Sequence, residues 1–301
     1  EVFLLTNQTP FYGESGGQIG DTGKLASVKG FQGEVEDTSK PLGRLHLLRT
    51  KVAKGQIIVG ETVHQIVDSE RRNRVRANHS ATHLLHAALR HRLGTHVTQK
   101  GSLVAPDYFR FDFSHPKALT REDIAAVEAE VNAQIRGNEQ VTTRLMTPDE
   151  AIAAGAMALF GEKYGDEVRV LSMGQREDSD YSVELCGGTH VRALGDIQLF
   201  KIVGESAVSS GVRRIEALTG EAARQWLIER DWKLREAATT LKSSPDEVPA
   251  RIASLVEERR RLERELADAR KAIAMGAGSA RSDASASEQV NGHQFIGQVV
   301  E

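Results

Sequence analysis

The 301-residue sequence has a single cysteine, Cys186, and contains no long apolar run. One cysteine cannot form an internal disulfide, so the small secreted proteins that depend on disulfides are excluded. No run reaches the roughly 20 apolar residues that span a bilayer, and no basic-then-apolar segment at the start indicates a signal peptide. These absences predict a cytoplasmic protein with no membrane partner.

The composition, with 40% hydrophobic and 27% charged residues, is that of an ordinary globular protein. The length favours two domains and an appendage. The sequence opens on Glu1 rather than on methionine, already in a strand-like apolar stretch. We therefore expect a piece of a longer chain or a processed chain.

Acidic residues are missing from one long window, between Arg71 and Pro106. The same window is rich in arginine and histidine, so it is locally positive in a protein whose net charge is −3. Such a face suits a polyanion, for example a phosphate backbone. The alternative is a solvated helix face whose neutralising acids come from elsewhere in the fold, and the sequence leaves both open.

Four segments differ in pattern, and together they predict the α+β class. Residues 1–69 hold short apolar runs broken by glycine, which favours a small β-barrel subdomain. Residues 70–219 mix strands and helices in one core domain. Residues 220–276 predict a helical hairpin or coiled coil, because apolar residues recur at spacings of three and four. Residues 277–301 predict a flexible linker and the first strand of a truncated C-terminal domain.

Local signals within the core domain are specific. The alternation in "YFRFDF" places Phe109, Phe111 and Phe113 on one face of a strand. Thr120 begins a capping-box pattern that predicts a helix to about residue 136. Thr147 precedes Pro-Asp-Glu, a pattern that predicts a second, shorter helix with proline at its first position.

Two pairs of residues have the character of metal ligands. His79 and His83 lie four residues apart on an expected helix, so their rings project from the same side. Cys186 and His190 have the same separation beside two glycines, which allow a tight turn. Three imidazoles and one thiolate form a set that tetrahedral zinc prefers. The competing explanation is two ordinary helical histidines and a cysteine in the core.

A zinc peptidase is disfavoured, because its helix would place a glutamate beside the first histidine. The three residues between His79 and His83 are Ser, Ala and Thr. His86 shares a face with His83 and could support a ligand, although a packed or surface histidine is the simpler expectation. No general base stands out: Glu184 and Asp180 are near Cys186 in sequence, but nothing singles them out.

Several motifs closely resemble the editing region of alanyl-tRNA synthetases and of related free-standing editing proteins. The resemblance runs in the family's order from residue 1 to about 220. The motifs that carry it are "TPFYGESGGQIGDTG" (9–23), "NHSATHLLHAALR" (78–90), "THVTQKGSLV" (95–104), "CGGTHV" (186–191) and "GVRRIEALTG" (211–220).

The resemblance implies an aminoacyl-tRNA deacylase that hydrolyses the ester of tRNA(Ala) wrongly charged with serine or glycine. It implies one zinc ion held by His79, His83, Cys186 and His190. It also implies that the parent protein ligates alanine to tRNA(Ala), in domains that we expect to precede Glu1. Nothing in the sequence resembles the aminoacylation domain, so we expect no ligase activity from this chain.

Gln99, in "VTQKGS", is implied by the resemblance as a pocket residue, and the glycine-rich segment 14–23 as part of the substrate wall. Discrimination between serine and alanine requires a site that hydrogen-bonds the serine hydroxyl, because alanine then leaves those groups unpaired. Gln99 or Thr22 is the candidate for this contact at the catalytic site.

The expected partners are the acceptor end of tRNA(Ala), the rest of the synthetase chain and a possible second copy in a homodimer. Arg72 and Arg76 lie on the helix of the first two ligands and are candidates for RNA binding; Arg213 and Arg214 are weaker ones. An alternative function is a zinc-stabilised module that binds tRNA or dimerises without turnover. A general metallohydrolase for small esters fits the basic window less well.

Overall fold

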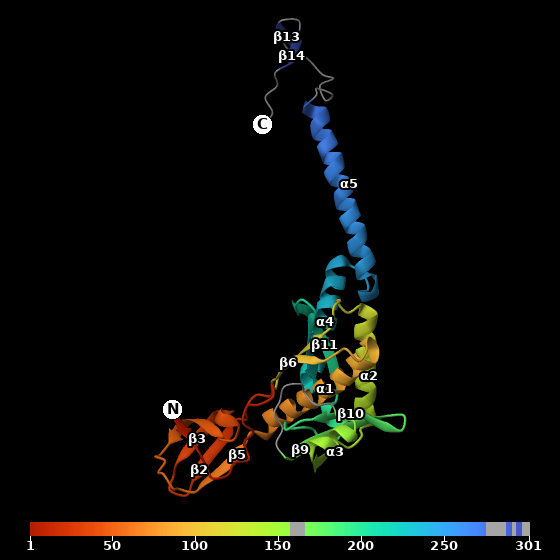
Figure 1. Cartoon of the computed structure of the whole chain (residues 1–301). Helices are drawn as coiled ribbons and strands as arrows, with labels where there is room; N and C mark the ends of the chain where they lie inside the picture. The colour runs from red at the N-terminus through yellow and green to blue at the C-terminus, as the bar shows by residue number, and fades with distance from the viewer. Residues whose placement is uncertain (157–165, 275–286, 291–292, 297–301) are drawn as a thin grey trace. The chain divides into compact units, whose positions relative to one another are not determined.

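The computed structural model describes residues 1–156, 166–274, 287–290 and 293–296. The chain divides into two compact units, Glu1–Leu227 and Ile228–Glu301. Figure 1 shows the elements of both along the chain. The expected linker at the start of residues 277–301 lies outside the described residues.

The first unit begins with one antiparallel sheet of five strands in the order β1-β4-β3-β2-β5. Phe11, Phe31 and Leu48 belong to the small core of this sheet and are almost completely buried. The linear order leaves β1 and β5 as edges, so the expected closed barrel is not confirmed. The strands are β1 (Val2–Leu4), β2 (Gly23–Ser27), β3 (Gln32–Ser39), β4 (Leu47–Lys54) and β5 (Val63–Val67).

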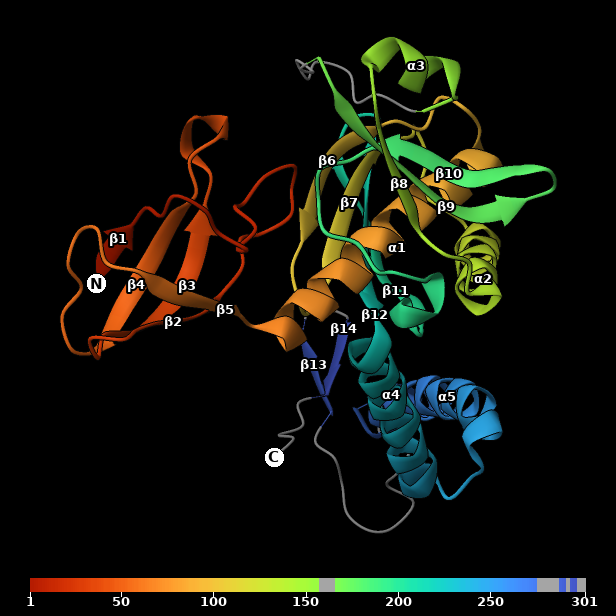
Figure 2. The same ribbon diagram turned by 90° about the horizontal axis from the view of Figure 1, so that it is seen from below.

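Helix α1 (Ser69–Leu93) is the centre of the first unit. Asp68 caps its first turn by accepting from the backbone N–H of Arg71, and Gly94 ends it. Every residue from 77 to 89 is buried. The helix packs against α2 (Arg121–Gly137) and on strands of the core sheets (Figure 2). The capping box of α2 at Thr120 confirms the sequence prediction.

A four-stranded antiparallel sheet lies against α1, with the order β11-β12-β7-β6. Phe109, Phe111 and Phe113 on β7 are fully buried, as their alternation predicts. The side chain of Asp112 between them is buried as well. The strands are β6 (Gln99–Val104), β7 (Phe109–Ser114), β11 (Phe200–Ser209) and β12 (Val212–Thr219).

A smaller antiparallel sheet, in the order β10-β9-β8, completes the first unit. Its strands are β8 (Thr142–Met146), β9 (Val168–Arg176) and β10 (Ser179–Leu185), and the short helix α3 (Pro148–Ala153) follows β8 as predicted. Because β10 packs on α1, the residues that directly follow β10 are delivered to that helix.

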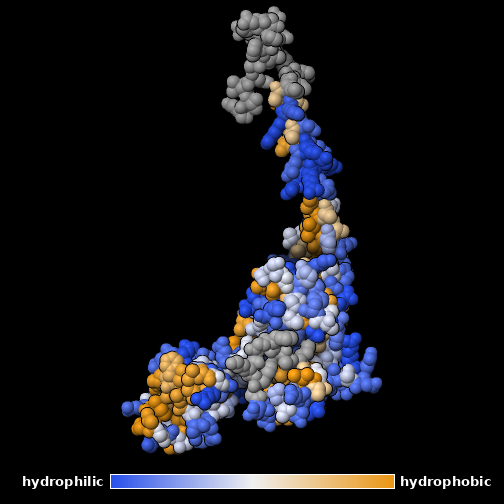
Figure 3. Space-filling model, viewed as in Figure 1, coloured by the Kyte–Doolittle hydropathy of each residue, from blue (hydrophilic) through white to orange (hydrophobic). Residues whose placement is uncertain are grey.

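Helix α4 (Gly220–Leu241) leads into the second unit, which also contains α5 (Val248–Ala274), β13 (Ser287–Val290) and β14 (His293–Ile296). Only Val248 of α5 is buried. Leu262 and Leu266 belong to the apolar residues whose spacing of three and four predicts a coiled coil. They remain 51% and 53% exposed, on a helix with a mostly hydrophilic surface (Figure 3). The expected hairpin, in which these side chains would be covered, is therefore not confirmed. No helix in the described part of the chain is long and apolar enough to cross a bilayer.

Candidate metal centre and its cavity

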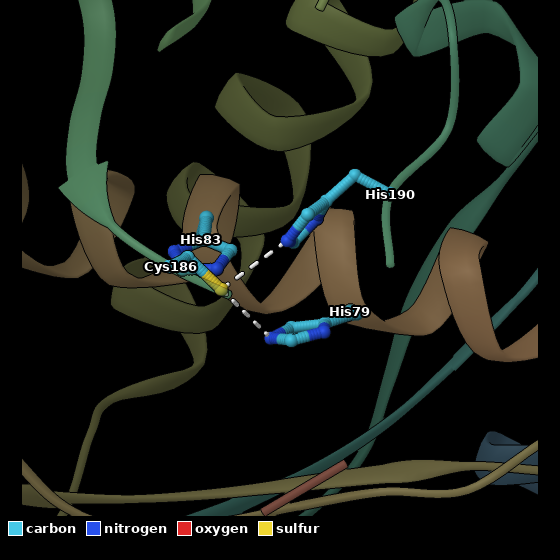
Figure 4. A group of neighbouring side chains, drawn as sticks. All are labelled: His79, His83, Cys186 and His190. Atoms are coloured by element: carbon cyan, nitrogen blue, oxygen red, sulfur yellow. Dashed lines mark hydrogen bonds between the residues drawn. The ribbon is translucent and has the colours of Figure 1, made fainter. Parts of the chain in front are cut away.

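The two predicted pairs of ligands come together. The ligand atoms of His79, His83, Cys186 and His190 all lie within 4.8 Å of one another. Helix α1 supplies the first two, and the turn after β10 supplies the others (Figure 4). Cys186 Sγ lies 3.2 Å from His190 Nε2 and 3.6 Å from His79 Nε2.

The turn after β10 can approach α1 this closely because residue 188 is glycine. A Cβ atom at Gly188 would lie 2.1 Å from Cε1 of His79, well inside any normal contact. The backbone N–H of Gly188 also points to Cys186 Sγ at 3.4 Å. Contact with the helix thus requires glycine at position 188, whereas a Cβ at Gly187 would meet no atom within 4 Å.

The tautomer of His79 is determined by its hydrogen bond to Gln18. Gln18 Oε1 accepts from the backbone N–H of Thr189 at 2.9 Å, which identifies this atom as the oxygen. His79 Nδ1 is 2.7 Å from the same oxygen and must therefore be the donor. A neutral His79 with its proton on Nδ1 would present an unprotonated Nε2 to the cysteine, which is the tautomer that a metal ligand requires.

Glu184 orients His83 in the same way. Its Oε2 lies 2.7 Å from His83 Nδ1, and its Oε1 lies 3.1 Å from His86 Nδ1. Burial opposes ionisation, but the two histidines outweigh it and hold the pKa of Glu184 well below its usual value. An ionised carboxylate only accepts, so both Nδ1 atoms donate. His83 Nε2 is buried without a hydrogen-bond partner, which leaves it available to a metal.

The protonation states of Cys186 and His190 favour metal binding. Burial opposes ionisation of Cys186, yet His79, His83 and the hydrogen bond with His190 hold the pKa of its thiol well below the usual value. Burial and the neighbouring His79 lower the pKa of His190 to about 3, so its imidazole is neutral. Burial also disfavours charge on His83, but Glu184 and Cys186 raise its pKa, so a metal would displace a proton there. A thiolate with three imidazoles fits zinc.

A cavity of about 340 Å³ opens beside these ligands. His79, His83 and Cys186 form part of its wall, and Gln99 is also among the lining residues. Thr22 lies outside the lining, and its backbone oxygen accepts from the N–H of Asp68. The other polar residues of the wall include Tyr12, Ser15, Lys40, Thr82, Ser102, Glu167, Arg169 and Glu184.

The arginines predicted to bind RNA already have partners within the fold. Arg72 forms an ion pair with the buried Asp21 and donates to the carbonyl of Pro10. Arg213 pairs with Glu205, and Arg214 donates two hydrogen bonds of 2.7 Å to Asp112. Of these three, Arg72 lies in the acid-free window, and its acid comes from 51 residues away, as the second explanation of that window expects.

Arg76 differs from the other three. Its Nη1 donates to Asn73 at 3.2 Å. Partial burial, with the positive charges of Arg72 and Arg192, lowers its pKa. Of the two candidates on α1, Arg72 is held by Asp21, whereas Arg76 has no ion pair among the described residues, so Arg76 stays a prediction for RNA binding.

Sequence reasoning missed two supporting residues and underrated two more. Gln18 and Ser80 were not identified; Ser80 Oγ lies 3.1 Å from His190 Nδ1 and accepts from the N–H of Val191. Glu184 was noted only for its position, and His86 was expected to be incidental. The one available signal was the place of Gln18 within the glycine-rich motif.

Comparison with known proteins agrees with this architecture. Residues 168–216 match the model of the threonyl and alanyl tRNA synthetase second additional domain, which covers β9 and β10 together with Cys186 and His190. Residues 1–71 match the model of class II (A) tRNA synthetases, so the expectation that nothing in the chain resembles the ligase part of the family is not confirmed for this segment.

Curated relatives match along the whole chain. Alanine--tRNA ligase of Rhizorhabdus wittichii is 70% identical over 305 residues, and that of Sphingopyxis alaskensis is 70% identical over 304 residues. The enzyme of Parvibaculum lavamentivorans is 58% identical over 305 residues. Each match covers 100% of this chain and 34% of the relative, so the chain spans about a third of their length. The chain belongs to the alanine--tRNA ligase family.

Proposed function

We propose that the cavity beside the metal centre hydrolyses the ester of tRNA(Ala) mischarged with serine or glycine. Its main support is the convergence of four metal-ligating atoms at the wall of a polar cavity that also contains Gln99. The match to the second additional domain and the name of the relatives connect this site to tRNA(Ala). In the longer protein, this reaction would correct errors of alanine ligation, with the rest of the synthetase chain as partner.

Zinc is the cofactor that the ligand set fits, held by His79, His83, Cys186 and His190. When bound, it supplies Lewis-acid polarisation close to the ester. The remaining tasks belong to the protein. Gln18 and Glu184 keep two imidazoles in the ligating tautomer, and both oxygens of Glu184 are engaged in doing so. Glu184 is therefore assigned to holding histidines, and we assign no general base. An aminoacyl ester is labile, so positioning water and substrate suffices.

Selection of serine over alanine follows from the polar wall. Gln99 lines the cavity and can hydrogen-bond a serine hydroxyl. Alanine would leave that amide unpaired, and an enzyme site that depends on a hydroxyl rejects analogues lacking it far more strongly than an apolar pocket can. Glycine also lacks the hydroxyl, so this contact accounts for the selection of serine alone. The same role for Thr22 stays a prediction, and it is the weaker one because Thr22 lies outside the cavity lining.

Lys40 and Arg169 are proposed to receive the phosphates of the tRNA acceptor end. Both line the cavity, whereas three of the four arginines proposed from sequence are held by acids. Arg169 also donates to the carbonyl of Gly188 at 2.6 Å, which fixes it beside the metal turn. Phosphate contacts position a nucleic acid without reading its sequence, which is the task required at an acceptor end.

The test is release of serine from Ser-tRNA(Ala) by this chain, beside Ala-tRNA(Ala) as the matched substrate. Serine release that spares alanine, and that is lost after zinc is removed with a chelator and regained on adding zinc, supports the proposal. Gln99→Ala should reduce the preference for serine. Equal rates on both substrates, or full activity in zinc-free protein, contradict it.

A second candidate is a zinc-stabilised module that binds tRNA or dimerises without turnover. Four protein ligands complete a tetrahedral shell, as structural zinc sites do. In that case zinc raises the melting temperature and tRNA binds, but neither ester is cleaved. The same assay therefore separates the two functions.

A further inference from the structure

Gln18 lies between the metal centre and the wall of the cavity. Its side chain is fully buried, and buried polar groups need hydrogen-bond partners. All three of its side-chain hydrogen bonds go to the metal side: Oε1 to His79 Nδ1 and to the N–H of Thr189, and Nε2 to Thr189 Oγ1. The amide thus joins a ligand on α1 to the turn that carries two further ligands.

The backbone next to Gln18, unlike its side chain, is part of the cavity wall. The N–H groups of Ser15 and Gln18 each donate to the other residue's carbonyl, which closes a tight turn. The carbonyl of Gly17 accepts from Val104 N–H at 2.7 Å, and Ile19 N–H donates back to Val104, so the turn is attached to β6. Gly17 has φ +85°, and a Cβ there would lie 2.6 Å from the carbonyl oxygen of Ser102.

The residues that these hydrogen bonds hold in place line the cavity that is proposed to receive the substrate. Ser15 and Gly16 of the turn line the cavity, and so do Gln99 and Ser102 of β6. A movement of Gln18 would therefore change the wall, and a movement of the wall would change the support of His79.

We propose that Gln18 is a positioning residue that couples metal occupancy to the order of the wall formed by residues 12–18. A metal on His79 Nε2 withdraws electron density from the ring, so Nδ1–H becomes a stronger donor to Gln18 Oε1. The tightened bond restrains the turn. Because coupling between two binding or ordering events is reciprocal, an ordered wall also tightens metal binding. This inference depends on the proposed metal site but not on ester hydrolysis.

The experiment uses the full chain and two substitutions of similar size. Gln18→Met removes the acceptor, whereas Gln18→Glu keeps an oxygen that can accept from His79 and from Thr189 N–H. Zinc affinity is measured by competition with a chelating dye. Hydrogen exchange at the backbone amides of residues 12–21 is compared with zinc and with chelator.

In the unsubstituted chain, zinc should slow exchange in this segment. Gln18→Met should lower zinc affinity by about 10- to 100-fold, the usual effect of losing a group that orients a ligand. In this variant zinc should no longer slow exchange of the segment, while Gln18→Glu should retain both properties. Protection of the β7 amides in each metal-free variant checks folding.

Gln18→Met with unchanged zinc affinity, or with undiminished zinc-dependent protection, overturns the coupling. If Gln18→Met does not fold, Gln18→Asn replaces it: the shorter amide cannot reach both His79 and Thr189, and its zinc affinity should fall in the same direction. If the unsubstituted chain binds no zinc, the metal site itself is wrong. Failure of ester hydrolysis alone leaves these measurements unaffected.

Discussion

Helices α1 and α5 are similar in length, 25 and 27 residues, and opposite in environment. α1 buries a continuous stretch that includes asparagine, serine, threonine and three histidines. α5 buries only Val248 and leaves leucines exposed. Burial of a helix is therefore decided by what the neighbouring elements supply and not by the apolar content of the helix.

The polar residues of α1 are buried because each finds a partner. Asn78 donates to the carbonyl of Ala105 at 2.7 Å and accepts from Thr219 Oγ1 at 2.7 Å. Thr82 Oγ1 donates to the carbonyl of Asn78. A buried polar group with a partner costs little, whereas one without a partner costs about 1–3 kcal/mol. α1 can therefore carry chemistry into a core.

The largest expected effect comes from equal truncations in the two helices. Leu84 is fully buried, so Leu84→Ala should lower the free energy of unfolding by about 2–5 kcal/mol. Leu262→Ala should change it by no more than about 0.5 kcal/mol, because its side chain is half exposed. Native-state hydrogen exchange of the amides in each helix measures both. Similar losses would mean that α5 is covered in solution.

The next largest effect is expected on the zinc affinity of the histidines of α1. Glu184→Gln leaves one acceptor oxygen where His83 and His86 both require one, so His83 loses its fixed tautomer. Zinc affinity should fall by about 10- to 100-fold. The matched control is Ser182→Ala, which removes only a 3.4 Å hydrogen bond to the same carboxylate. An equal loss in the control would point to disruption of β10 instead.

A smaller effect is expected on tRNA binding when a cationic side chain of the cavity beside α1 is compared with one on the surface of α5. Lys40→Ala should raise the KM for Ser-tRNA(Ala) several-fold and reduce the slope of log affinity against log salt by about one, as expected for one lost phosphate contact. Arg260 pairs with Glu257 on the surface of α5, and Arg260→Ala should change neither quantity. If both substitutions act alike, tRNA binding depends on overall charge and not on the cavity.

The sequence predicted those parts of the molecule that depend on local pattern. The capping boxes of α2 and α3 and the buried face of β7 follow from residues only a few positions apart. The four metal-ligand candidates were found because each pair has a regular spacing and because the motifs resemble a known family. That the pairs meet depends on the packing of β10 on α1, which no spacing reveals.

The remaining features depend on long-range pairing, which the sequence does not encode in any short window. Gln18 is 61 residues from His79, and Asp112 is 102 residues from Arg214. Arg72, in the acid-free window, is likewise 51 residues from its partner Asp21, so the window looked free of partners when it was not. The expected barrel and hairpin likewise required knowledge of which sheet edges and helix faces meet.

The smallest effect tests whether the exposed faces of the two helices differ at all. Arg74 pairs with Glu70 on α1, and Arg259 pairs with Glu263 on α5, each across one helical turn. Exposed pairs of this kind contribute about 0.3–0.5 kcal/mol. Glu70 precedes Arg74, the orientation favoured by the helix dipole, whereas Arg259 precedes Glu263. Arg74→Ala should therefore destabilise its helix slightly more than Arg259→Ala, measured by hydrogen exchange of the flanking amides at low and high salt. A loss above 1 kcal/mol at either position would show that the charged face has a partner, and the contrast between α1 and α5 would then extend beyond their buried residues.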